Sequence, residues 1–231
     1  MAISSDLTLP NGRKLSYAAY GSTSTTAPVV FYHHGFPASH AEARLYDTAA
    51  QKHETRLIAI DRPGMGNSTH QPNRQLLDWP AHLLALTDHL KVEHAGIVSG
   101  LYPRSLGTAG MLFEARMMLY VAPWLAGLVA FGLDKGLGVI ARDGEHPGKF
   151  ERALASNLTS RPPVDRELRN RELWNGDVGG FRQTHVESTR EALRDGGHGP
   201  AWEARLIGSD WEFPLEELSA EAGKMFLWHG G

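Results

Sequence analysis

The sequence contains no cysteine. This absence excludes a disulfide framework, a thiolate zinc site and a cysteine nucleophile. An excess of positive charge is missing too, because 23 Lys and Arg stand against 26 Asp and Glu, which gives a net charge of −3. Proteins that bind nucleic acid carry a basic face, so we expect no nucleic-acid partner.

A secretory signal and a metal-ligand pattern are also missing. The first residues, Met1-Ala2-Ile3-Ser4-Ser5-Asp6, have neither the basic nor the apolar region of a signal, so we expect a cytoplasmic protein. The spacing of the histidines is not typical of metal ligands, so we expect no metal site. The positions considered are His53, His70, His82, His89, His94 and His146.

What the sequence does contain is a strand–helix–strand pattern. Two short runs rich in β-branched and aromatic residues, 28–33 and 56–60, flank a segment that begins with the capping-box residues Ser39 and Glu42. The pattern predicts two parallel, buried strands joined by a helix over about 40–53.

The neighbouring segments extend this unit on both sides. Asn11-Gly12 is a strong turn dipeptide and predicts a β-hairpin within residues 7–20. Asp78 is expected to cap a helix that ends near Leu90. Together these elements predict the fold class α/β.

Each strand of the central unit ends in a glycine loop. The first loop is His34-Gly35-Phe36-Pro37, and the second is Asp61-Arg62-Pro63-Gly64-Met65-Gly66-Asn67-Ser68. In this order and at this spacing, the two loops make residues 7–94 resemble the α/β-hydrolase fold. The resemblance implies a mostly parallel sheet with flanking helices and an inserted helical cap. It also implies hydrolysis of an ester or amide of an apolar small molecule through an acyl-serine, without a metal or organic cofactor.

The resemblance assigns roles to the loop residues. In this family the loop after the first strand supplies a backbone N–H to the oxyanion hole, which here is that of Phe36, next to Gly35. The alternative is that Gly35 and Pro37 only shape a tight turn. Residues expected to shape the two loops are His34, Pro37, Asp61, Gly64 and Gly66.

The nucleophile motif of the family, Gly-x-Ser-x-Gly, is absent. The nearest match is Ser99, which has Ile97 and Leu101 where the motif has glycine. In one interpretation, residues 95–100 are the nucleophile strand with a degraded turn. In the favoured one, they are the following strand, the nucleophile strand and its helix are absent, and the segment is free to move into the vacant central position.

The catalytic acid and base are not found either. Residues 224–228 are expected to form another buried strand, which runs into His229-Gly230-Gly231. In the family, the acid and then the histidine follow such a strand. We therefore expect an incomplete hydrolase-type fold that is impaired or inactive. The alternatives are a non-catalytic, pocket-bearing binding protein and a truncated or mispredicted product.

The expected organisation is a core over residues 1–100, a helical cap over 101–216 and a core strand over 217–231. Within the cap, residues 117–133 carry no charge and contain Pro123, which favours a helical hairpin or two short helices. We expect this segment to bind an apolar ligand or to mediate self-association. A membrane-surface segment is the alternative, and we do not expect it to cross a bilayer.

Two shorter patterns complete the expected cap. Thr184 and Glu187 form a second capping-box pattern, which predicts a helix over 187–195. Trp202 and Trp211 are expected to anchor the cap on the sheet.

Overall fold

The computed structural model describes most of the 231-residue chain. The described residues are 3–92, 95–98, 104, 107–109, 111, 113–159, 174, 176–211, 213–214 and 217. Ser99, the expected strand 224–228 and His229 lie outside them.

A five-stranded sheet forms the centre of the described structure, with the strand order β1-β2-β4-β3-β5. β1 and β2 make an antiparallel hairpin, and β2 pairs antiparallel with β4. β3 pairs in parallel with both β4 and β5, which confirms the predicted hairpin and strand–helix–strand unit. The strands are β1 (Ile3–Thr8), β2 (Lys14–Gly21), β3 (Val29–His33), β4 (Arg56–Ile60) and β5 (Ala95–Val98).

Residues 95–98 form β5, and its pairing shows where this segment lies in the sheet. Tyr32 of β3 stands opposite Val98, so β5 takes the place directly beside β3. No strand separates the two in the described sheet. Residues 95–98 therefore occupy the position next to β3, at the edge of the described sheet.

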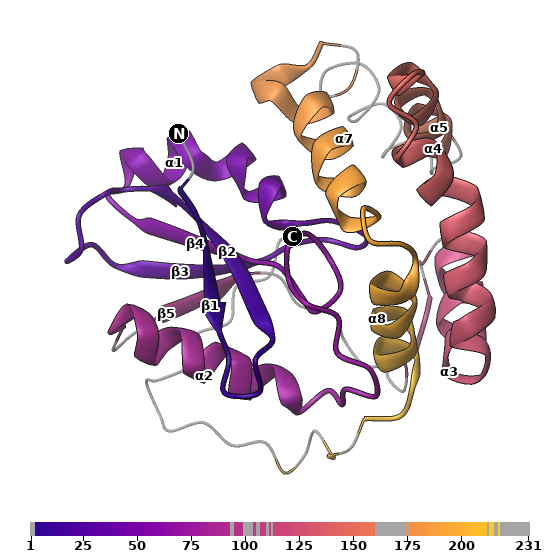
Figure 1. Cartoon of the computed structure of the whole chain (residues 1–231). Helices are drawn as coiled ribbons and strands as arrows, with labels where there is room; N and C mark the ends of the chain where they lie inside the picture. Colours follow the sequence, from indigo (N-terminus) through magenta and orange to yellow (C-terminus); the bar gives the residue numbers. More distant parts are fainter. Residues whose placement is uncertain are drawn as a thin grey trace.

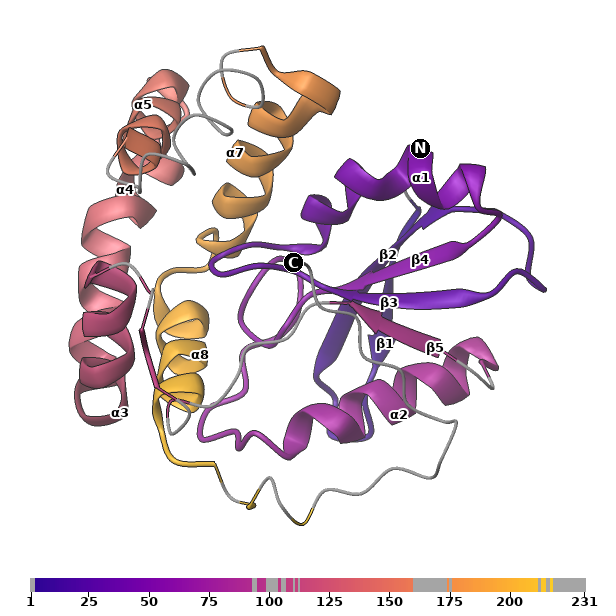
Figure 2. The ribbon, with the colours of Figure 1, turned by 180° about the vertical axis from the view of Figure 1, so that it is seen from behind.

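Helices cover both faces of the sheet (Figures 1 and 2). One face packs on η1 (His40–Tyr46) and α1 (Asp47–Lys52), and the other packs on α2 (Asp78–Leu90). β4 shows how the alternation of a strand serves both layers. Its Ile58 and Ile60 belong to the cluster beneath α2, whereas Leu57 and Ala59 belong to the cluster beneath η1 and α1. A strand buried on both faces has the continuous apolar character that its sequence shows.

The helix predicted over 40–53 is present, but the capping box is not reciprocal. Ser39 Oγ accepts from the Ala41 N–H, as a cap should. The Glu42 carboxylate, however, turns to the N–H of Gly35 and the hydroxyl of Tyr32. Asp78 also differs slightly from expectation, because it is the first residue of α2 and Leu77 is the cap.

The second half of the described chain is helical. Its α3 consists of two helical stretches joined by a kink at Leu125, two residues after Pro123, which agrees with the expected two short helices and not with the alternative of a hairpin. By length and composition, the segment Phe113–Ala141 could cross a membrane, and it is the one such helix among the described residues. The elements are α3 (Phe113–Leu133), η3 (Asp134–Gly138), α4 (Val139–Ala141), α5 (Pro147–Thr159), η5 (Val178–Gly180), α7 (Phe181–Ala192) and α8 (His198–Gly208).

The helix predicted from Thr184 and Glu187 begins earlier than expected. α7 starts at Phe181 after Gly180, and Thr184 is buried inside it, so the second capping box is wrong. Asp177 supplies the capping oxygen, since its Oδ1 accepts from the Arg182 N–H at 2.8 Å. An acidic side chain just before a helix satisfies amides that have no partner within the helix.

Candidate active site

Two loops meet at the carboxyl ends of neighbouring parallel strands. Residues 34–37 follow β3 and residues 61–68 follow β4, and both lie next to α7 and α8 (Figure 1). The carboxyl edge of a parallel sheet is where α/β proteins bind ligands. We therefore take this edge as the candidate active site.

In the loop after β3, residues 34–37, the backbone amides of Gly35 and Phe36 differ in their partners. The N–H of Gly35 donates to the Glu42 carboxylate, which also accepts from the Tyr32 hydroxyl at 3.0 Å. The N–H of Phe36 has no hydrogen-bond partner among the described residues. Of the two amides singled out from the sequence, the described hydrogen bonds thus occupy that of Gly35.

His34 lies fully buried beneath this loop. Its Nε2 accepts from the backbone N–H of Arg62 at 3.2 Å, which places the proton of the neutral ring on Nδ1. Nδ1 then donates to the Gly35 carbonyl at 2.9 Å. Burial, with the Arg62 charge beside it, holds the pKa of His34 well below the usual range. A neutral ring with both nitrogens engaged positions the two loops and is a poor general base.

Asp61 joins the second loop to the start of η1. Its fully buried carboxylate accepts from the His40 N–H at 2.6 Å, from His40 Nδ1 at 2.8 Å and from the Asn67 N–H at 3.0 Å. Burial disfavours the charged His40 ring, but the hydrogen bond and charge of Asp61 outweigh it and raise the pKa of His40. We call the Asp61–His40 pair the clamp. Both carboxylate oxygens of Asp61 accept hydrogen bonds in it.

Gly64 and Gly66 have backbone conformations that favour glycine, with φ of +82° and +53°. A Cβ on Gly66 would overlap the Asp61 carboxylate. A Cβ on Gly64 would lie 2.7 Å from His70 Nδ1 and 2.8 Å from the Cα of Gly199 in α8. The first glycine therefore lets α8 approach the loop, and the second makes room for the clamp.

α8 is held on the site by a buried ion cluster. Its Glu203 reaches Arg62 Nε at 3.2 Å with one oxygen and Arg74 Nη2 with the other. Burial lowers the pKa of Arg62 and of Arg74 to about 10, so both remain charged at neutral pH. Trp202 Nε1 donates to the Arg74 carbonyl at 2.9 Å, and Trp202 is thus one anchor of α8.

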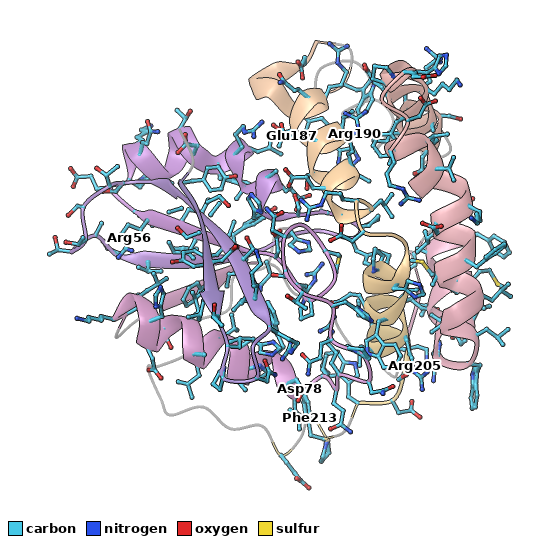
Figure 3. All side chains as sticks on the ribbon, viewed as in Figure 1. Arg56, Asp78, Glu187, Arg190, Arg205 and Phe213 are labelled. Carbon is cyan, nitrogen blue, oxygen red and sulfur yellow. The ribbon has the colours of Figure 1, made fainter. Side chains whose placement is uncertain are left out.

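α7 is fixed from two sides (Figure 3). Toward the sheet, Ser188 Oγ accepts from the Ser39 N–H at 2.8 Å and donates to the Ser39 carbonyl at 3.2 Å. Glu187 makes a two-pronged ion pair with Arg44 of η1, at 2.6 and 3.0 Å. Toward the other helices, Arg190 Nε donates to the Ala141 carbonyl at 3.1 Å.

A separate cavity of about 280 Å³ lies between residues 73–76 and the end of α8. It is lined neither by residues 34–37 nor by residues 117–133. No group of three His, Asp or Glu that could hold a metal ion occurs in the part of the chain that the structure describes. The cavity is lined by Asn73, Arg74, Gln75, Leu76, Trp202, Arg205, Leu206, Ser209, Asp210 and Trp211.

The structure thus brings together the loop residues chosen from the sequence, namely His34, Gly35, Phe36, Pro37, Asp61, Gly64 and Gly66. The sequence analysis missed three partners, His40, Glu42 and Glu203. Glu203 stands 129 positions from Arg74, and no local pattern signals such a contact. Ser99 follows the last residue of β5 in the sequence and lies outside the described residues.

The sequence matches no family model, and no curated protein matches it. Solved structures do resemble it. Epoxide hydrolase A from Mycobacterium thermoresistibile is 17% identical, with a TM-score of 0.58 over 94% of this chain and 77% of that chain. Epoxide hydrolase VrEH1 from Vigna radiata is 17% identical, with a TM-score of 0.53 over 90% and 72%. An E-2-(acetamidomethylene)succinate hydrolase is 14% identical, with a TM-score of 0.51 over 91% and 75%.

Two other matches cover a smaller part of the solved protein. This chain spans 30% of the length of VrEH2 and 34% of a thioesterase domain from the curacin biosynthetic pathway. At identities of 14–17%, the three longer matches establish the fold alone. Together with the parallel β4–β3–β5 arrangement and its two loops, they show that the chain has the α/β-hydrolase fold.

Proposed function

We propose that this protein acts on an ester or amide of an apolar small molecule, with the N–H of Phe36 as an oxyanion donor and impaired turnover. The observation that supports this is the Phe36 amide at the carboxyl end of β3, which has no hydrogen-bond partner within the described part of the chain. Backbone amides aimed at a developing oxyanion are a main source of rate enhancement in acyl transfer.

Ser99 is the candidate nucleophile, since it directly follows Val98, the last residue of β5. In the proposed step, its hydroxyl oxygen adds to the substrate carbonyl carbon and the oxyanion accepts from the Phe36 N–H. The alcohol or amine then leaves with the hydroxyl proton, and water releases the acid and regenerates the serine. The helices of residues 101–216 are proposed to act as the cap over this site.

The proposed turnover is slow because neither of the histidines that hold the two loops can readily take the serine proton. Among the described residues, His34 is neutral with both nitrogens engaged, and His40 is held by Asp61. An unactivated serine hydroxyl is a weak nucleophile. The rate enhancement that remains comes from substrate binding and from the oxyanion donor.

A fluorophosphonate probe with an alkyl chain tests this proposal, because it reports nucleophilicity without turnover. We expect slow, incomplete labelling, which peptide mass spectrometry should map to Ser99. The matched control is Ser99→Ala, which should lose this slow labelling. Rapid stoichiometric labelling that maps to Ser99 and disappears in the variant would instead indicate a fully activated serine.

The cavity beside α8 favours a second candidate, a non-catalytic binding protein. Its walls combine two indoles, Trp202 and Trp211, with the Arg205 guanidinium, which lies 4.9 Å from the centre of the Trp202 ring. An aromatic carboxylate fits this chemistry. Titration with benzoate, followed by tryptophan fluorescence, should saturate in the wild type and weaken at least about tenfold in Arg205→Ala. An unsaturable response would exclude this candidate.

A further inference from the structure

The outer face of α3 is apolar and exposed. Trp124 is 83% exposed, and Leu128 and Phe131 are each 61% exposed. The opposite face, with Leu119, Ala122 and Ala130, is buried. Figures 2 and 3 show α8 on one side of α3 and side chains projecting from its outer side. The outer face is formed by Phe113, Met117, Tyr120, Trp124, Leu128 and Phe131.

A continuous apolar stripe of this size is uncommon on a monomer and marks an interaction surface. Six large side chains that are about half exposed or more present on the order of 600 Å² per copy. Two such faces together bury roughly 1,200 Å², which reaches the lower limit of a standard stable interface. A second copy of the chain would therefore offer enough surface to cover the first.

Exposed charges lie near both ends of the stripe. Glu114 and Arg116 lie at its start, and Lys135 lies beyond its end, in η3. Glu114 and Lys135 have no ion-pair partner within the described ranges, since the nearby Asp134 pairs with Arg142. An antiparallel pair brings Glu114 of one copy toward Lys135 of the other, so these two unpaired charges favour that orientation.

We propose that α3 pairs antiparallel with α3 of a second copy. In this arrangement Glu114 of each copy faces Lys135 of the other, and Val121 faces Leu128. Met117 then faces Gly132, where an added Cβ would meet nothing within 4 Å. Large side chains thus lie opposite exposed backbone, which lets two helices approach closely. A parallel arrangement would instead place like charges opposite each other.

The two-fold axis of this pair passes between residues 124 and 125. The kink of α3 is at Leu125, so both helices bend at the axis, and the pairing stays symmetric on either side of it. A symmetric interface of this kind closes on two copies and gives a dimer rather than a filament. The inference is independent of the proposed hydrolytic function.

Sedimentation velocity of the full chain over a range of micromolar concentrations tests the pairing. We expect a monomer–dimer equilibrium in the wild type and a monomer in Leu128→Glu. Leu84→Glu is the matched control, because Leu84 is 63% exposed on α2, and it should leave the equilibrium unchanged. Circular dichroism should show that each variant keeps its helix content.

Charge reversal tests the antiparallel register. Glu114→Lys alone and Lys135→Glu alone should each weaken the dimer about tenfold, since two ion pairs per dimer become repulsive. The double variant should return to within about threefold of the wild type, because the pairs are restored with their signs exchanged.

Three results would overturn the proposal. They are a wild type that stays monomeric at every concentration, a dimer that persists in Leu128→Glu, and a double variant no tighter than the single ones. Phosphatidylcholine vesicles distinguish the main competitor. If the monomer binds them and Leu128→Glu does not, α3 faces a lipid surface instead of a second copy.

Discussion

At the scale of single residues, Asp61 holds the two loops of the site together. Its carboxylate satisfies two backbone amides and the His40 ring in a fully buried position. Asp61→Ala leaves these donors unpaired, so we expect a loss of about 3–5 kcal/mol in the free energy of unfolding by urea. Asp88→Ala on the exposed side of α2 is the control and should change it by less than about 0.5 kcal/mol. Equal, small effects would mean that the clamp contributes little.

His33 makes stability depend on pH. Burial, assisted by the Arg62 charge, lowers its pKa from 6.5 to about 4, and its Nδ1 has no hydrogen-bond partner in the described structure. Because the folded pKa is depressed, the stabilisation is complete above pH 6.5 and is lost as the pH falls toward 4.

The variant His33→Phe keeps a ring against Trp79 but removes the titration. Between pH 6 and 4, its free energy of unfolding should fall less steeply than that of the wild type, by up to about 1.4 kcal/mol per pH unit. Identical slopes for the two proteins would show that His33 is protonated as easily in the folded state as in the unfolded one.

At the scale of elements, buried hydrogen bonds fix α7 more firmly than its visible ion pair does. Ser188→Ala leaves the buried Ser39 N–H unpaired and should cost about 1–3 kcal/mol. Glu187→Gln breaks a pair with Arg44 in which both side chains are about 40% exposed, and it should cost less than about 1 kcal/mol. Urea unfolding of both variants checks the order, and the reverse order would contradict it.

The ends of α8 are packed backbone to backbone. A Cβ on Gly208 would overlap the Leu119 carbonyl of α3, so Gly208→Ala should cost about 1–3 kcal/mol. Gly148 of α5 is the matched control, since its added Cβ meets only the flexible end of Arg152, at 3.2 Å. Gly148→Ala should be neutral or stabilise by about 0.5 kcal/mol. If both variants behaved alike in urea unfolding, the close contact between α8 and α3 would be wrong.

How far the sequence predicts each element depends on the range of the interactions that form it. The β1–β2 hairpin and the β3–β4 unit were predictable, because Asn11-Gly12 and the apolar runs act within a few residues. The capping pattern of Thr184 and Glu187 failed, since Thr184 is buried by tertiary packing within α7. Glu203 was missed because its partners, Arg62 and Arg74, are more than 120 positions away. For the site, the loops were found and the groups that hold them were not.

At the scale of the whole molecule, side chains from α7 and α8 contact the carboxyl edge of the parallel strands, where α/β proteins bind ligands. Glu203, Ser188 and Glu187 from α8 and α7 reach the loops and the start of η1. Among the residues that the structure describes, the Phe36 amide has no hydrogen-bond partner. These contacts support the proposal that the α/β-hydrolase fold is here combined with little catalytic power.

Turnover of p-nitrophenyl butyrate by the purified protein and by Ser99→Ala tests this central claim most directly. We predict a wild-type kcat/KM at least about 1,000-fold below the 10⁴ M⁻¹ s⁻¹ typical of slower enzymes, and a lower value still for Ser99→Ala. Turnover in the ordinary enzymatic range that vanishes in Ser99→Ala would contradict the account and establish Ser99 as an activated nucleophile.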